Sequence, residues 1–283
     1  MERQFFIGIS WDKRPQHMNT QCLSPIDHLN TRTMKRSVKD YVRANELKVS
    51  EKAGLSAIAA EARNRPILDL GVGAGRTVRA LMDISRDYVG VDSVPEMVET
   101  CRERFASAHF EQADARNLSQ FEDNSFFFTV FSANGICMVD HEGRMAILRE
   151  VFRLLEPGGA FLFSSYNRNC SNYETFFRFP AFKLTADPFK LMVRGLRFPF
   201  DTGISVLNWT RLKGQEQRCN EYSIINDASH NYAVMLYYTS LENHLRQLEL
   251  TGFRDVIAFD AAGQRITKST RDNSILFLAR KPR

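Results

Sequence analysis

One short stretch decides the fold, and it reads Ile67-Leu68-Asp69-Leu70-Gly71-Val72-Gly73-Ala74-Gly75-Arg76. Its first four residues are mostly apolar and predict a short buried strand. Three alternating glycines follow, and helical spacing begins at Thr77. Glycines without a Cβ allow a sharp turn and a close approach of the backbone to a ligand, while the next helix offers unpaired N–H groups. The stretch therefore predicts a nucleotide-binding turn.

The spacing of these glycines separates two classes of nucleotide site. A dinucleotide fingerprint needs Gly-x-Gly-x-x-Gly, and Arg76 stands where its third glycine belongs. The stretch instead reads Asp-x-Gly-x-Gly-x-Gly, which resembles the first motif of the class I S-adenosylmethionine (SAM) methyltransferases. The resemblance implies SAM as cofactor and S-adenosylhomocysteine as its product. It also implies the cofactor-binding residues Asp69, Gly71, Gly73, Gly75 and Arg76.

A second acid follows at the end of the next expected strand. Residues 88–92 are mostly apolar and end in Asp92, and Ser93 is expected to cap a helix with Pro95 in its first turn. A carboxylate at this strand end can accept both ribose hydroxyls. The alternative is that Asp92 only caps the helix. NAD carries the same ribose, so Asp92 alone does not decide the cofactor.

The third expected strand, 109–112, leads to Asp114 and Ala115. This pair resembles the adenine-binding corner of SAM enzymes, in which the carboxylate takes the exocyclic amine. An ordinary turn is the alternative for Asp114. NAD enzymes do not usually place an acid here, so the corner favours SAM. The resemblance adds Ser93, Met97 and Ser132 to the cofactor site.

A second signature follows the fourth expected strand, 126–131. Residues 143–155 have helical spacing, and the string Arg-Leu-Leu-Glu-Pro-Gly-Gly at 153–159 runs into a strand at 160–165. Proline and paired glycines end a helix and reverse the chain. The string resembles a signature of small-molecule class I methyltransferases. The resemblance covers residues 60–166 and, in outline, 241–281.

These segments predict an α/β fold, a three-layer α/β/α sandwich around a seven-stranded, mostly parallel sheet. A helix at 240–250 and strands at 253–260 and 274–280 resemble the antiparallel hairpin that closes such sheets. The expected parts are an N-terminal arm and cap helices (1–60), a SAM-binding Rossmann-like core (61–167), an inserted substrate lid (168–239) and the C-terminal end of the core (240–283).

The N-terminal part has no clear period over residues 1–23, and helices are expected from Ser24 onward. In SAM methyltransferases the helices before the first strand often close over the cofactor. Tyr41 lies on one apolar stripe of these helices. It either bonds the methionine carboxylate of SAM or packs in the core.

The inserted lid joins an aromatic and basic first half to an expected hairpin at 219–225 and 232–239. The first half interleaves the rings of Tyr173, Phe176, Phe177, Phe179, Phe182, Phe189, Phe198 and Phe200 with the cations of Arg168, Arg178, Lys183, Lys190, Arg194 and Arg197. Three interpretations stay open for it. They are a small hydrophobic core, a pocket for an aromatic or acidic small substrate, and a surface for RNA or a membrane.

Composition argues against several other classes. Five scattered cysteines without a Cys-x-x-Cys pair argue against a disulfide framework or zinc site, and predict reduced thiols in the cytoplasm. The sequence shows no cluster of His and carboxylate residues that would predict a metal site. No apolar run approaches eighteen residues, so no membrane span is expected, and 5–9 is too short for a signal peptide. The net charge of +5 is mild, and no RNA-binding module is visible, which argues against a nucleic-acid partner.

The chemistry follows from the cofactor, because a sulfonium already activates its methyl group and the protein supplies alignment and a dry site. We expect Asn134 and Tyr166 to orient the acceptor, although Asn134 could equally serve a left-handed turn. His141 is an available base, in a turn that predicts an exposed position. The hypothesis is methyl transfer to N, O or C of a small molecule. The alternatives are an RNA or protein acceptor and a non-catalytic SAM-binding partner subunit. The sequence leaves a homodimer open.

Overall fold

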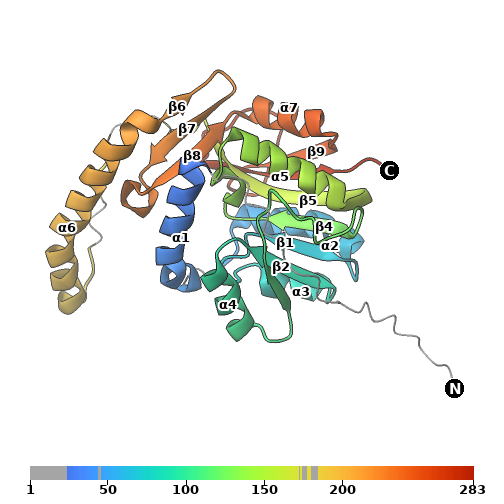
Figure 1. Cartoon of the computed structure of the whole chain (residues 1–283), viewed down its shortest axis with the longest axis horizontal. Coiled ribbons are helices and arrows are strands. Elements are labelled where there is room, and N and C mark those ends of the chain that lie inside the picture. The colour runs from blue at the N-terminus through green and yellow to red at the C-terminus, as the bar shows by residue number, and fades with distance from the viewer. Residues whose placement is uncertain (1–23, 44–45, 172, 174–176, 180–183) are drawn as a thin grey trace.

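The computed structural model describes residues 24–43, 46–171, 173, 177–179 and 184–283. The expected arm at 1–23 therefore lies outside the described residues, as do Phe176, Phe182 and Lys183 of the inserted segment. The described chain forms a central sheet with helices on both of its faces (Figure 1).

The central sheet carries β1 (Ile67–Leu70), β2 (Tyr88–Asp92), β3 (His109–Gln112), β4 (Phe126–Phe131), β5 (Leu155–Asn167), β9 (Arg254–Phe259), β10 (Arg265–Ile266) and β11 (Ser274–Arg280). Its order is β10-β9-β11-β5-β4-β1-β2-β3. Strands β1 to β5 run parallel, and β11 lies antiparallel between β5 and β9. The predicted mostly parallel sheet with an antiparallel end is confirmed in β3-β2-β1-β4-β5-β11-β9, but the described sheet has eleven strands rather than seven. The two-residue β10 adds to its edge.

Two layers of helices cover this sheet, which confirms the predicted sandwich. One layer holds α2 (Val49–Ala62), α3 (Val78–Ile84) and α4 (Pro95–Arg104), and the other holds α5 (His141–Leu154) and α7 (Leu241–Thr251). Neighbouring residues of one strand serve both layers, because successive side chains point to opposite faces. Phe161 and Phe163 pack in the cluster of α5 and α7, and Leu162 packs in the cluster of α2, α3 and α4.

Two helix starts show how local chemistry sets the element ends. The helix α1 (Pro25–Arg43) begins where expected, and the Asp27 N–H donates to Ser24 Oγ at 3.3 Å. The cap of α4 is Val94 and not Ser93, so that expectation was wrong. Asp92 Oδ1 accepts the Val94 N–H at 2.9 Å, and the strand-end acid thus holds this turn itself.

The fifth strand is longer than expected. The helix α5 begins at His141 with Asp140 as its cap, and β5 begins directly after it at Leu155. The Pro-Gly-Gly string therefore lies inside β5 rather than before it. The reason is a partner from the far end of the chain: Gly158 N–H donates to Lys281 O, and Lys281 N–H donates to Gly159 O, both at 2.9 Å.

The inserted segment divides into a helix and a hairpin. The expected hairpin is confirmed as β7 (Tyr222–Asp227) and β8 (Val234–Thr239), joined through the short helix η3 (Ser229–Tyr232) and flanked by β6 (Gln217–Arg218). Strand β8 also pairs in parallel with the end of β5, at Tyr166 and Asn167. The hairpin therefore extends the main sheet beyond the end of the core, which the sequence did not predict.

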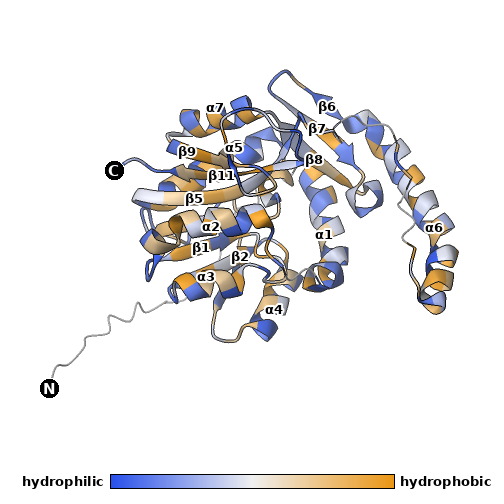
Figure 2. Ribbon diagram, turned by 180° about the vertical axis from the view of Figure 1, so that it is seen from behind, coloured by the Kyte–Doolittle hydropathy of each residue, from blue (hydrophilic) through white to orange (hydrophobic). Residues whose placement is uncertain are grey.

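The first half of the insertion folds mainly as one helix, α6 (Pro188–Leu212), followed by the short η2 (Lys213–Gln215). Both views place α6 at the rim of the molecule, beyond the hairpin and α1 (Figures 1 and 2). Among the described helices, none joins the length and the hydropathy that a bilayer crossing requires.

Candidate functional site

The glycine turn adopts the conformation that its sequence predicts. Gly71, Gly73 and Gly75 have φ values of +59°, +56° and +85°, a region that favours glycine. A Cβ at Gly71 would lie 2.5 Å from the ring of Phe131. A Cβ at Gly73 would meet its nearest side-chain atom, Tyr41 Cδ1, only at 3.7 Å. Gly71 is thus required for close packing, whereas a Cβ at Gly73 would make an ordinary contact with Tyr41 of α1, so glycine is favoured there by the positive φ.

The carboxylate of Asp92 joins the end of β2 to this turn. Its Oδ2 accepts the Gly73 N–H at 2.9 Å, and its Oδ1 accepts the Val94 N–H at the same distance. Burial raises the pKa of Asp92, while these backbone donors oppose the rise. Asp92 thus holds the start of the helix α4, as the alternative interpretation of this residue expected. Each carboxylate oxygen has a second lone pair, so the same group can still accept from a ligand.

Asp69 lies fully buried beneath the turn. Its Oδ2 accepts the hydroxyls of Thr77 at 2.6 Å and Tyr88 at 3.0 Å. Its Oδ1 has no hydrogen-bond partner among the described residues. Burial raises the pKa of Asp69 to about 7 against the opposing effect of the two hydroxyls. The two hydroxyl partners are far from obvious in the sequence, because they come from α3 and β2.

Arg76 is held by an ion pair from the preceding helix layer. Its guanidinium contacts the buried carboxylate of Glu51 through both terminal nitrogens, at 2.5 and 2.7 Å. The Nη2 atom also donates to Ser132 Oγ at 3.2 Å. Two residues expected in the cofactor site, Arg76 and Ser132, are thus brought together, and Glu51 of α2 is a third member that sequence reasoning missed.

The residues expected to orient the acceptor also come together. Asn134 precedes the short helix η1 (Gly135–Cys137), has a left-handed backbone with φ +60°, and donates its N–H to Ser164 Oγ at 2.8 Å. The ring of Tyr166, whose hydroxyl lies near the Asn134 side chain, stacks on Tyr238 at 4.9 Å. Burial and, next, the charge of Asp227 raise the pKa of Tyr166. Tyr166 therefore stays protonated and serves as a hydrogen-bonding group rather than a base.

His141 lies on the other side of the sheet. Its Nδ1 is 2.9 Å from Tyr237 Oη, and its ring stacks on Tyr222 at 4.4 Å. Tyr237 and Tyr238 are successive residues of β8, so they point to opposite faces, and Tyr238 is the one against Tyr166. The expected exposed position is wrong, because His141 is half-buried and burial lowers its pKa. The sheet itself separates His141 from Asn134 and Tyr166.

The helix α1 covers the glycine turn. Its apolar side chains pack against the cluster that follows the turn, which consists of Ala74, Val94 and Met97. Tyr41 is one of these covering residues, with Met34, Val38 and Val42 beside it. The Tyr41 hydroxyl donates to Met34 Sδ at 3.3 Å. Tyr41 thus packs as a core residue in this structure and at the same time lies against Gly73 of the turn.

Comparison with known proteins bears on this geometry. Residues 67–159 match the sequence family described as a methyltransferase domain. The uncharacterized methyltransferase YcgJ of Bacillus subtilis (strain 168) is 33% identical over 118 residues, which are 40% of this chain and 45% of that protein. This chain therefore spans less than half the length of that curated relative. The glycine turn, Asp69 of β1 and Asp92 at the end of β2 all fall in the segment 67–159 that matches the family.

Residues 67–159 are therefore similar to a methyltransferase domain. Solved structures agree in fold. The CcbJ methyltransferase of Streptomyces caelestis has a TM-score of 0.61 at 16% identity, with 90% of this chain and 99% of that chain covered. The Burkholderia thailandensis 1,6-didemethyltoxoflavin-N1-methyltransferase, solved with 1,6-didemethyltoxoflavin and S-adenosylhomocysteine, has a TM-score of 0.55 at 14% identity, with 90% and 88% covered.

The third acid of the candidate site, Asp114, is engaged by a neighbour. Both oxygens of Asp114 accept from the guanidinium of Arg116, and Arg116 also pairs with the buried Asp27 of α1. Arg116 thus links the expected adenine corner to the helix that covers the glycine turn. Ala115 packs against the core beside this pair. The adenine role of Asp114 and Ala115 stays a prediction.

The inserted hairpin brings a further histidine against α1. His230 Nδ1 lies 3.0 Å from Ser37 Oγ of α1, and its ring stacks near Tyr41 at 6.3 Å. His230, Asn231 and Tyr232 are three successive non-glycine residues with φ between +51° and +58°. Such a run costs on the order of 1 kcal/mol per residue and persists only where the surroundings enforce it. No local pattern in the sequence signals it.

The turn at His230 is enforced by side chains from two elements. Asn226 Nδ2 donates to the carbonyls of Tyr232 and Val234 at 2.8 and 3.0 Å. Asn208 Nδ2 of α6 donates to the carbonyl of Asn231 at 2.9 Å. These amides hold His230 against α1.

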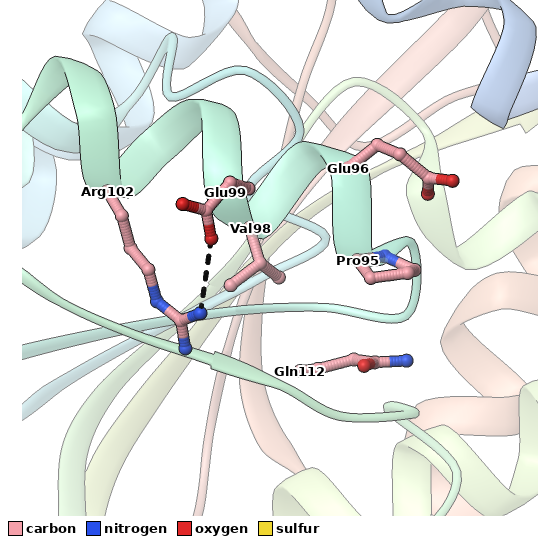
Figure 3. Close-up of a pocket in the computed structure, with 6 residues that line it drawn as sticks. All are labelled: Pro95, Glu96, Val98, Glu99, Arg102 and Gln112. Carbon is pink, nitrogen blue, oxygen red and sulfur yellow. Dashed lines mark ion pairs between the residues drawn. The ribbon is translucent and has the colours of Figure 1, made fainter.

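A surface cavity of about 340 Å³ lies beside the site, between α4 and the end of β3. Figure 3 shows its lining by Pro95, Glu96, Val98, Glu99, Arg102 and Gln112, with an ion pair of 3.5 Å between Glu99 and Arg102. Glu96 also pairs with Lys35 of α1 at 3.3 Å. The glycines and acids of the turn do not line this cavity, so it is separate from the cofactor residues.

Proposed function

We propose that this protein is a SAM-dependent methyltransferase that transfers a methyl group to nitrogen, oxygen or carbon of a small molecule. The observation that carries the proposal is the bond from the Gly73 N–H to the Asp92 carboxylate, at the carboxyl edge of a parallel sheet. Open α/β sheets bind ligands at that edge. The match of residues 67–159 to a methyltransferase domain supports the same assignment.

The residues present fit such a cofactor. A buried acceptor beneath the turn, Asp69 Oδ1, has no hydrogen-bond partner among the described residues, and Tyr41 of α1 lies against Gly73 of the turn. SAM would be held by the glycine turn, with Asp92 toward the ribose and Asp114 toward the adenine, and it would supply a methyl group activated by its sulfonium. Arg76 keeps the turn in place through Glu51.

The acceptor would lie between Asn134, Tyr166 and the aromatic residues of the insertion. Tyr173 and Tyr238 pack with Tyr166 in one cluster at the joined ends of β5 and β8. Aromatic walls of this kind suit a planar apolar substrate and exclude water from the reacting atoms. The B. thailandensis neighbour, which methylates 1,6-didemethyltoxoflavin at N1, shows that this fold can serve a small-molecule acceptor.

Catalysis by this arrangement relies on proximity. Asn134 and Tyr166 would orient the acceptor atom toward the methyl group by hydrogen bonds, because a methyl transfer in line needs alignment more than proton transfer. An acceptor that is protonated at neutral pH would also need a base. His230 is the histidine on this side of the sheet, and burial lowers its pKa, so it is neutral at pH 7.

The test is incubation of the purified chain with methyl-labelled SAM and a fractionated lysate. Label in a small-molecule fraction supports the proposal. Label in RNA or in protein replaces it by the corresponding macromolecular methyltransferase. Binding of SAM without label in any fraction favours a non-catalytic SAM-binding subunit. Asp92→Asn serves as the impaired variant, and Asp87→Asn, at the opposite end of β2, serves as its matched control.

A further inference from the structure

The outer face of α6 carries an exposed apolar stripe. Eight of the thirteen large apolar side chains that are exposed among the described residues belong to this helix. Six of them recur every three or four residues along one face, at Phe189, Val193, Leu196, Phe200, Ile204 and Leu207. Residues at this spacing form one continuous stripe on a helix. Phe200 is 76% exposed and Leu196 is 68% exposed, so the stripe faces solvent along its length.

The rotation of α6 is fixed by its inner face, so the exposure of the stripe is built into the fold. Leu212 and Ser205 are buried on that inner side. Trp209 packs edge-on against Phe177 at 5.7 Å, and Asn208 donates to the hairpin at Asn231. A helix anchored in this way cannot turn its stripe inward. Contiguous apolar surface of this extent marks a binding surface in soluble proteins.

The charges beside the stripe identify the occupant. Arg194, Arg197 and Arg211 are exposed on α6, with Arg197 beside the stripe, Arg194 farther round the helix and Arg211 at the C-terminal end. Asp201 is the acidic residue of α6. An amphipathic helix with apolar and aromatic residues on one face and basic residues beside them is the pattern that binds the interface of an anionic membrane. Arginine side chains can keep their charge at the headgroups while their stems lie along apolar surface.

A second copy of the chain fits the stripe less well. Two α6 helices packed antiparallel would place the sides with Arg194 and Arg197 against each other. Packed parallel, the basic edge would face an edge that carries Met192, Pro199 and Val206 rather than acids. Paired helices of this kind use opposite charges along the seam, and α6 supplies one acid. A proline inside the helix also bends the seam.

We propose that the exposed face of α6 binds a membrane surface that contains anionic lipids. The helix lies on the surface and does not cross it, since no described helix has the length and hydropathy to span a bilayer. Its place at the rim of the molecule lets it meet a flat surface before the sheet does (Figures 1 and 2). This inference is independent of the proposed methyl transfer.

The test is co-sedimentation of the full chain with phosphatidylcholine vesicles and with vesicles that also contain phosphatidylglycerol. We expect binding to the anionic vesicles that weakens with salt, because exposed charges are screened over about 10 Å at 0.1 M. Replacing Arg194 and Arg197 by Gln should lower the partition coefficient by roughly 25-fold, about fivefold for each cation. Leu196→Glu should lower it by about tenfold or more, through lost apolar burial.

Leu250→Glu is the matched control, because Leu250 is 72% exposed on α7. It should bind vesicles like the wild type, and a thermal melt of each variant checks that it folds. Three outcomes overturn the proposal. The first is an equal loss of vesicle binding in Leu250→Glu. The second is a wild type that does not bind vesicles and forms a dimer, seen by light scattering, that Leu196→Glu dissociates. The third is a wild type that does not bind vesicles and is retained on bulk RNA. Equal binding to both kinds of vesicle overturns its electrostatic part.

Discussion

Replacing Asp92 by Asn tests the cofactor site most directly. In the structure both carboxylate oxygens accept buried backbone N–H groups, from Gly73 and Val94. Asparagine has the same shape but only one accepting oxygen, so one of these N–H groups loses its acceptor. We expect the ligand-free protein to lose about 1–3 kcal/mol of unfolding free energy, the usual cost of such a group. The change also removes the charge that would bind the ribose hydroxyls.

The loss in binding can be converted to a melting shift. Charge-assisted hydrogen bonds contribute roughly 1.5–3 kcal/mol, so losing their charged acceptor should weaken S-adenosylhomocysteine binding by about 10- to 100-fold. Ligand at a hundred times the wild-type Kd stabilises the wild type by about 2.7 kcal/mol. For 283 residues with an unfolding entropy of about 2.1 cal/mol/K each, that is a rise of roughly 4–5 °C. The same ligand concentration should raise the melting temperature of the Asp92→Asn variant by about 1–2 °C.

The assay is thermal unfolding with and without S-adenosylhomocysteine, with each variant compared with its own ligand-free melt. This comparison separates the loss of binding from the loss of stability. Asp87→Asn is the control, because Asp87 is exposed and precedes the same strand at its other end. A full ligand shift in Asp92→Asn would refute the role of this carboxylate. A wild type that responds to NAD and not to S-adenosylhomocysteine would refute the cofactor itself.

Two further predictions concern the acceptor and the buried acid. Tyr166→Phe keeps the ring on Tyr238 but removes the hydroxyl, so the S-adenosylhomocysteine shift should persist while label transfer slows by roughly 10- to 100-fold; an unchanged rate would contradict the orienting role. Asp69 has its pKa raised to about 7, so between about pH 4 and pH 7 the folded state holds a proton that the unfolded state has released. Stability should therefore fall as pH rises through this range, by at most about 4 kcal/mol, and urea unfolding of Asp69→Asn at pH 5 and pH 8 should lack this fall.

Much of the core could be read from local patterns. The strand at 67–70, the turn glycines, the strand that ends in Asp92 and the closing strands at 254–259 and 274–280 agree with the structure. Each depends on residues within about one turn or strand of each other. Apolar runs specify buried strands, and positive φ values specify glycine, so few neighbours are needed to predict them.

The candidate site was harder to predict from the sequence, because the residues that contact one another in it come from distant segments. Glu51 binds Arg76, and Arg116 joins Asp114 to Asp27, across helices whose docking no local pattern states. The position of Ser93 shows the same limit within a single turn. A serine before a helix favours a cap, but Asp92 was already placed to take that N–H.

The two histidines show what the sequence leaves open and the tertiary structure decides. The sequence offers His141 as a base, and the structure adds His230 as a second candidate. The pairing of β8 with β5 puts Tyr238 beside Tyr166 and sends Tyr237, with His141, to the opposite face. The hairpin turn then carries His230 to α1.

The sequence by itself thus determined the order of strands and helices, the glycine turn, and the acids Asp69 within β1 and Asp92 at the end of β2. These depend on backbone conformation and burial, which a few neighbouring residues specify. The tertiary structure alone decided which side chains share the site, which face each histidine occupies and that the stripe of α6 stays uncovered. Those outcomes depend on contacts between segments more than 200 residues apart, such as the bond from Asn30 Nδ2 to Met235 O, and only the packed sheet and helices bring such segments together.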